Sequence, residues 1–195
     1  IGFVQGAKAA KSDIKIMYNY SGTFSDTNKG KTLAATMYDS GADVIFVAAG
    51  NTGNGVISEA KERGNLDMSK DGEIKHWVVG VDKDQYEEGI FKGKDKNGKE
   101  YQKSVILTSA VKNIEVAVTK ILNEIKENKF EKGEHIFGIK ENGVGLPKEN
   151  PNLSDDNKTK IDKAIEELKS GKVEVVGTGD ELKAKGSVTN LEGEL

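Results

Sequence analysis

Two nearly continuous apolar runs of strand length constrain this chain more than any other feature. They cover residues 43–49 (DVIFVAA) and 77–81 (WVVGV). Runs of this kind are typical of parallel strands that are buried on both faces of a sheet. Parallel strands need crossover connections, which are usually helices, so the sequence between and after these runs is expected to be helical.

Apolar residues do recur at helical spacing outside these runs, over residues 29–40, 113–128 and 157–170. Gly41 follows the first of these segments, where a left-handed cap commonly ends a helix. The alternation of strands and helices predicts βαβ units, and therefore an α/β fold whose parallel sheet carries helices on both faces. Residues 1–10 are expected to form a helix or, less favoured, a strand, and residues 56–63 a helix. Further strands are expected over 14–20, 105–109 and 135–139, with an extended run over 172–176. Residues 50–55 are expected to form a glycine-rich turn, and residues 86–103 an exposed excursion.

Composition excludes several kinds of site. The chain has no cysteine, which removes disulfides, thiolate catalysis and zinc–thiolate centres. Its net charge of -3 gives no basic footprint for nucleic acid. The sequence also lacks a GxSxG elbow, an HExxH pair, EF-hand spacing and a Walker motif. His76 and His135 each stand alone beside a predicted strand. We therefore expect no catalytic residue, metal or cofactor.

The termini of the predicted strands are where a ligand site is expected, because open α/β sheets bind ligands outside the carboxyl ends of their strands. Phe46 lies within the first apolar run, the glycine-rich residues 50–55 follow that run, and Asp82 follows the second. Lys112 follows the strand predicted at 105–109, and residues 138–146 follow the one at 135–139. Each position has a plain alternative: a tight turn, a helix cap, a solvated lysine or a loop.

Residues 19–65 supply a more specific signal, since they read NYSGTFSDTNKGKTLAATMYDSGADVIFVAAGNTGNGVISEAKERGN. This block resembles the basic membrane protein family, and the later segments GVDKDQ, LTSAVKNIEVAV and GVGL fall in the family's order. The resemblance covers residues 2–176. It implies a lobe of the type I periplasmic-binding-protein fold, a three-layer parallel-sheet unit, from a lipid-anchored ABC importer component that clamps a purine nucleoside between two lobes.

The resemblance also assigns ligand contacts position by position. Phe46 matches the aromatic residue that stacks on the purine. Asp82 matches the acid that holds the ribose hydroxyls, and Lys112 matches the lysine that donates to a ribose oxygen and balances that acid. The remaining candidates are the glycine-loop residues Gly50, Thr52 and Gly53, together with Gln85.

The same resemblance implies a domain plan in which this chain is the second lobe and the first lobe is missing. Residues 1–103 would form the second lobe, 104–133 would cross over to pack on the absent first lobe, and 134–176 would return. Residues 177–195 are a tail of unknown role. An apolar helix face in the crossover segment would then lack its partner, unless a second copy covers it in a domain-swapped dimer; it comprises Ile114, Val118, Ile121 and Ile125.

The function implied is that of a non-catalytic solute-binding component on the extracellular face of the bacterial membrane. Its partners would be a purine nucleoside, bound weakly by this chain alone, and an ABC permease, with membrane attachment only through an N-terminal lipid anchor outside this sequence. Two alternatives stay open. One is a nucleoside hydrolase or sugar-phosphate enzyme that uses Asp82 and Asp84, and the other is a surface sensor or adhesion module.

Overall fold

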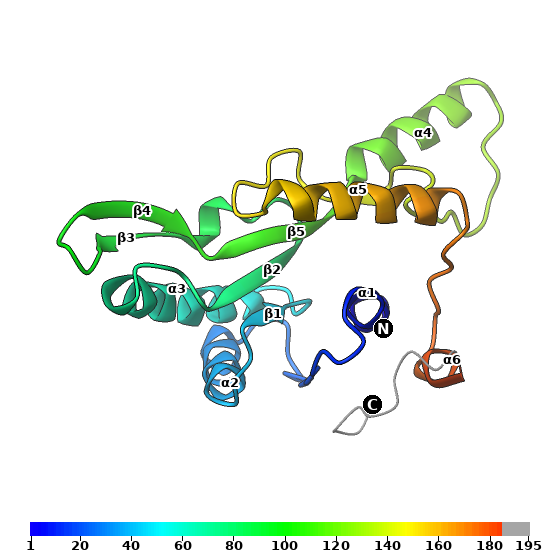
Figure 1. The fold of residues 1–195 in the computed structure, drawn as a ribbon. Helices are drawn as coiled ribbons and strands as arrows, with labels where there is room; N and C mark the ends of the chain where they lie inside the picture. Colours follow the sequence, from blue (N-terminus) through cyan, green and yellow to red (C-terminus); the bar gives the residue numbers. More distant parts are fainter. Residues whose placement is uncertain (185–195) are drawn as a thin grey trace.

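The computed structural model describes residues 1–184 and contains a four-stranded sheet of order β1-β2-β5-β6 (Figure 1). Both apolar runs are strands, β1 (Val44–Phe46) and β2 (Trp77–Asp82). These two and β5 (Ile106–Lys112) are mutually parallel, whereas the short β6 (Val144–Gly145) runs antiparallel to β5. The predicted α/β fold with a mainly parallel sheet is therefore confirmed.

Helices α2 (Thr27–Asp39) and α3 (Thr52–Lys70) pack against each other below the sheet in Figure 1. Glycines allow their close approach. A Cβ atom added at Gly55 would lie 1.9 Å from the carbonyl oxygen of Thr27, and one at Gly30 would lie 2.0 Å from a backbone oxygen at the start of α3. The helix predicted at 56–63 therefore begins earlier, inside the glycine-rich segment, because these glycines serve helix packing.

The hydrophobic core lies between this helix pair and the sheet. Residues of α2, α3, β1, β2 and β5 contribute to it, together with Phe91. Val78 and Val105 are fully buried, and Ile106 is almost so. Side chains of this kind stabilise a fold by about 1.5–3 kcal/mol each when fully buried. The described residues of α1 (Gly2–Ala10) include no buried side chain, and the same holds for the helices α4 (Ile114–Lys126) and α5 (Asp155–Lys169). The core is thus one-sided.

The segment expected to be an exposed excursion is partly ordered against this core. It forms a 3-10 turn (Glu87–Gly89) and the antiparallel hairpin of β3 (Ile90–Lys94) and β4 (Glu100–Ser104). Phe91 is buried, and its ring meets that of Tyr101 edge-on with centroids 5.7 Å apart. One face of the hairpin therefore packs on the molecule, which corrects the sequence prediction.

Three segments predicted as strands or extended runs, at 14–20, 135–139 and 172–176, are not strands in the described structure. The sheet order ends at β1 on one side and at β6 on the other, so these segments have no ladder partner. Side-chain bonds hold one of them instead: the amide of Gln5 donates to the carbonyl of Glu174 at 2.8 Å. A segment with the sequence pattern of a strand but no partner strand cannot form inter-strand backbone hydrogen bonds, so it stays a loop.

The remaining helices follow the predicted periodicity. They are α4 (Ile114–Lys126) and α5 (Asp155–Lys169), which confirm the helices predicted at 113–128 and 157–170. Ser154 caps α5 by accepting a hydrogen bond from a backbone N–H of its first turn. A short α6 (Gly179–Ala184) occupies the start of the predicted tail. The rest of that tail, residues 185–195, lies outside the described residues.

Candidate functional site

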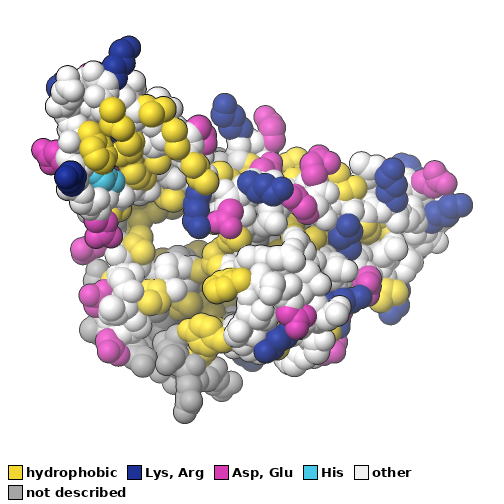
Figure 2. All heavy atoms as spheres, turned by 180° about the vertical axis from the view of Figure 1, so that it is seen from behind, with side chains coloured by type: hydrophobic (Ala, Val, Ile, Leu, Met, Phe, Trp, Pro, Cys, Tyr) yellow, Lys and Arg dark blue, Asp and Glu magenta, His cyan; other side chains and the backbone are white. Residues whose placement is uncertain are grey.

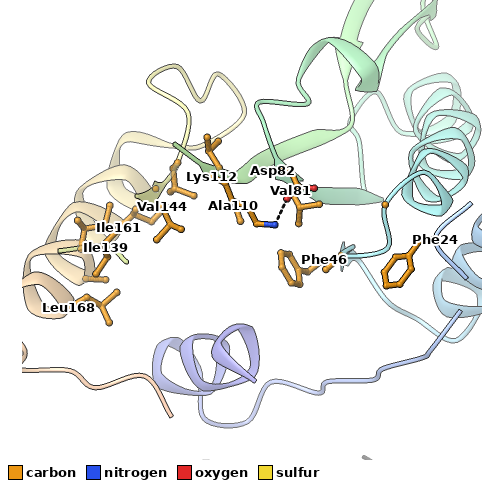
Figure 3. Close-up of a pocket in the computed structure, with 17 residues that line it drawn as sticks. Phe24, Phe46, Val81, Asp82, Ala110, Lys112, Ile139, Val144, Ile161 and Leu168 are labelled. Atoms are coloured by element: carbon orange, nitrogen blue, oxygen red, sulfur yellow. Dashed lines mark ion pairs between the residues drawn. The ribbon is translucent and has the colours of Figure 1, made fainter. Parts of the chain in front are cut away.

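The carboxyl ends of β1, β2 and β5 open into one cavity of about 740 Å³. Phe46, Asp82 and Lys112 line it from these three strand ends, as Figure 3 shows. Parallel strands place their carboxyl ends at one edge of the sheet, so residues far apart in the sequence meet there. The structure thus brings together three of the predicted site residues.

Asp82 and Lys112 form an ion pair across neighbouring strands, with Lys112 Nζ 2.8 Å from Asp82 Oδ1. The register explains the pairing, because Asp82 lies opposite Val111 in the β2–β5 ladder. Asp82 also has a left-handed backbone, with φ of 70°. Such a conformation is uncommon for a non-glycine residue but is tolerated by Asp and Asn. Both side chains are more than half exposed, so the pair remains open to a ligand.

Gln85 lies behind this pair and does not line the cavity. Its side-chain oxygen accepts a hydrogen bond from the backbone N–H of Val81 at 2.9 Å. Its own backbone N–H donates to the buried hydroxyl of Ser109 at 3.1 Å. These two bonds close the loop after β2 and tie it to β5. Gln85 therefore positions the backbone that carries Asp82.

The predicted glycine-loop residues separate into two groups. Gly50 lines the cavity and has a φ of 54°, which favours glycine. Thr52 is almost fully buried and its hydroxyl donates to the carbonyl of Thr23 at 3.2 Å. Gly53 is buried beneath Val47. Of the three candidates, Gly50 alone reaches the cavity, and the other two support the start of α3.

Part of the cavity wall was not predicted as a site. The inward face of α5 forms one side, and its periodicity was visible in the sequence but indicated packing alone. Phe24, in the loop before α2, also lines the cavity and is largely exposed. Further apolar lining comes from the segment around β6. This segment supplies Ile139, Val144 and Leu146, which lie within the candidate residues 138–146. The α5 residues Ile161, Ala164, Ile165 and Leu168 were not predicted as site residues.

Asp82 and Lys112 are the charged side chains among the cavity-lining residues. The neighbouring Lys83 instead pairs with Glu88, whose hydrogen bond raises the pKa of Lys83. Among residues 1–184 no group of three or more His, Cys, Asp or Glu side chains is arranged to hold a metal ion. Within the same residues, no helix is long and apolar enough to cross a membrane. The cavity therefore offers an apolar wall, the aromatic rings of Phe24 and Phe46, and one pair of opposite charges.

Solved structures share this architecture. A solute-binding protein of an ABC transporter system from Aeropyrum pernix superposes with a TM-score of 0.67 at 22% identity, covering 95% of this chain and 57% of that chain. A solute-binding protein from Conexibacter woesei gives 0.62 at 20% identity, covering 88% and 49%. At this identity the likeness concerns the fold, which is a lobe of the periplasmic-binding-protein kind.

Sequence comparison is more specific. The ABC transporter nucleoside-binding protein BmpA of Lactococcus lactis is 42% identical over 175 residues, which are 89% of this chain and 47% of that protein. The CD4+ T-cell-stimulating antigen of Listeria monocytogenes is 38% identical over the same shares. This chain thus spans about half the length of these curated relatives. Residues 1–177 match the sequence model of the family described as ABC transporter substrate-binding protein PnrA-like, and the chain belongs to that family, Bmp.

Proposed function

We propose that this chain forms one wall of a nucleoside-binding site in the substrate-binding component of an ABC importer. The observation that carries the proposal is the Asp82–Lys112 pair, 2.8 Å apart, at the edge of an apolar cavity that Phe46 also lines. The name of the Lactococcus lactis relative, a nucleoside-binding protein, supports the same ligand class.

The chemistry of these groups suits a nucleoside. A carboxylate accepts hydrogen bonds only, so Asp82 can take both hydroxyls of a ribose diol. An ammonium donates only, so Lys112 can bond a ribose oxygen while it balances the acid. The apolar wall and the ring of Phe46 suit a purine, which binds through its π-face. Each kind of group matches one part of the ligand.

The same geometry favours binding over hydrolysis. A hydrolase that uses two acids would need a second carboxylate at the cavity, and Asp84 does not line it. Its Oδ1 instead accepts a hydrogen bond from the backbone N–H of Tyr86 at 3.0 Å. Asp82 is itself opposed by an ammonium group rather than by another acid. Incubation with inosine should release neither free base nor ribose, and release of either would favour the enzyme.

Titration of the isotope-labelled 195-residue chain with purine nucleosides tests the binding site by nuclear magnetic resonance. Backbone signals at Phe46, Gly50, Asp82 and Lys112 should shift saturably with inosine, and less with 2′-deoxyinosine. Charge-assisted hydrogen bonds contribute about 1.5–3 kcal/mol, so Asp82→Asn should weaken inosine binding by about tenfold or more. Lys83→Met is the matched control, because Lys83 pairs with Glu88. Absence of saturable shifts would contradict the proposal.

The α4 region supports the further proposal that a missing part of the protein completes the site. Figure 2 shows an apolar patch over α4 and the segment that follows it. Ile114 is 65% exposed and Leu122 is 59% exposed, values that are unusual for large apolar residues on an amphipathic helix. The half of the relatives' length that this chain does not span is the occupant we propose for this face.

Complementation tests that occupant. The part of the Lactococcus lactis relative that this chain does not match, added as a separate polypeptide, should bind this chain and strengthen its affinity for inosine. Leu122→Glu should abolish that association, whereas Leu66→Glu, on another exposed apolar residue, should leave it intact. Self-association of the chain that Leu122→Glu removes would favour a domain-swapped dimer instead.

Attachment to the extracellular face of the membrane through a lipid anchor, and delivery of the ligand to an ABC permease, belong to the same proposal. Membership in the substrate-binding family supports both. Fractionation of the native bacterium should place the whole protein in the membrane fraction, and protease added to intact cells should digest it. Recovery of a protease-protected protein would refute this localisation.

A further inference from the structure

The ring of Phe46 has an intramolecular partner on α1. Phe3 stacks on it with ring centroids 5.1 Å apart and planes inclined by only 8°. Phe46 lines the cavity whereas Phe3 does not, so the two rings do not share the same surface. Figure 3 shows α1 running past the cavity on the side of Phe46 that faces away from Lys112. Phe3 therefore backs the aromatic ring that faces the cavity.

Two hydrogen bonds of the Gln5 side chain hold α1 in this place. The side-chain amide of Gln5 donates to the carbonyl of Glu174 at 2.8 Å and accepts from the backbone N–H of Val176 at 3.1 Å. A Cβ atom added at Gly2 would lie 3.5 Å from the side chain of Val175, which is an ordinary contact distance. The segment after α5 thus pairs with α1 through both polar atoms of one side chain, and the position of Phe3 depends on this attachment.

We infer that Phe3 is a positioning residue, which holds the ring of Phe46 in the orientation that meets the base of a bound nucleoside. This inference rests on the proposed function. A role in the core does not explain Phe3, because it is 42% exposed and α1 contributes no buried residue among those described. The ring of Phe3 instead stacks in parallel on the ring of Phe46.

The effect on binding follows from preorganisation. Phe46 is only half-buried, and without Phe3 its ring would sample other rotamers in the free protein. Ordering one side chain on binding costs about 0.5–1.5 kcal/mol, and a phenylalanine with two rotatable bonds belongs near the lower end of that range. The apparent affinity falls in proportion to the fraction of competent conformers. Loss of the ring at position 3 should therefore weaken binding by about twofold to fivefold.

Three variants of the full chain test this role in the inosine titration. Phe3→Leu keeps an apolar side chain but removes the ring, so it should weaken binding by about twofold to fivefold. Phe3→Tyr keeps the ring and should restore wild-type affinity. Phe130→Leu is the control, because Phe130 stacks on His135 in another part of the molecule, with centroids 5.4 Å apart. The ratio of inosine to 2′-deoxyinosine affinity should stay constant in all three, since Asp82 is unchanged.

A spectroscopic measurement without ligand separates failure of this inference from failure of the proposed function. Ring protons of selectively labelled Phe46 should resonate upfield in the wild type and move downfield in Phe3→Leu but not in Phe3→Tyr. Unchanged Phe46 signals in Phe3→Leu would overturn the inference whether or not inosine binds. Wild-type or tighter inosine affinity in Phe3→Leu would also overturn it, since tighter binding would make Phe3 a competitor of the base. A wild-type chain that shows the ring shifts but no inosine binding would refute the proposed function alone.

Discussion

Replacement of Gly55 by alanine is the most discriminating test of how the glycine-rich segment works. A Cβ atom at this position would lie 1.9 Å from the carbonyl oxygen of Thr27, whereas real Cβ atoms essentially never come closer than 3.0 Å to such an atom. The clash is with backbone, so α2 and α3 must move apart by about 1 Å. Overpacking of this kind costs about 1–3 kcal/mol, and the strain exceeds the gain of about 1 kcal/mol in helix propensity.

Gly6→Ala in α1 is the matched control, since nothing lies within 4 Å of a Cβ atom added there. Urea unfolding followed by circular dichroism should show a midpoint lowered by roughly 1 M for Gly55→Ala, for a slope of about 2 kcal/mol per M. The midpoint of Gly6→Ala should rise, because alanine gains helix propensity without a clash. Equal midpoints for Gly55→Ala and the wild type would refute the packing role of this glycine.

Three further predictions concern the core and its polar border. Burial raises the pKa of Tyr38, so this tyrosine ionises at lower pH in the unfolded chain than in the folded one. The free energy of unfolding should therefore fall above about pH 10, by up to about 1.4 kcal/mol per pH unit. Tyr38→Phe should flatten this slope in urea titrations at successive pH values. Phe91→Ala should lower the free energy of unfolding by about 3–5 kcal/mol, because the ring is buried in the core cluster, and a loss below 1 kcal/mol would contradict that packing. Arg63→Ala leaves the largely buried carboxylate of Glu59 without its partner at 2.8 Å and should cost about 2 kcal/mol, whereas Arg63→Lys should recover part of that loss.

The fold could be predicted from the sequence wherever the chain also contains the element against which a segment pairs or packs. The apolar runs became β1 and β2 because they pair with each other, and α4 and α5 follow their helical periodicity. Residues 14–20 carry a strand pattern as well, but a strand also needs a neighbour, and the ladder stops at β1. Hydrophobic pattern is local, whereas pairing is not, and the pattern alone could not reveal a missing neighbour.

The same distinction between local pattern and non-local pairing applies to the residues of the candidate site. Phe46, Asp82 and Lys112 are the last residues of β1, β2 and β5. The rule that ligands bind at the carboxyl ends of parallel strands was enough to place them together. Gln85 and Thr52 have the same sequence signals but support the backbone, because their polar atoms are taken by Val81 and Thr23. Donor and acceptor pairing of this kind depends on contacts across loops, which residue type and spacing do not encode.

The one-sided core explains how the proposed site can keep its geometry. β1, β2 and β5 are fixed from one side by α2 and α3, so Phe46, Asp82 and Lys112 keep their positions without a contribution from α4. The other wall of the cavity consists of the inward face of α5 and the segment around β6. Small-molecule sites usually bury 70–90% or more of their ligand. A nucleoside at this edge would make its polar contacts but leave much of its surface in water. Its affinity should therefore rise sharply when a second body covers the cavity, and this dependence ties the exposed face of α4 to the function of the strand edge.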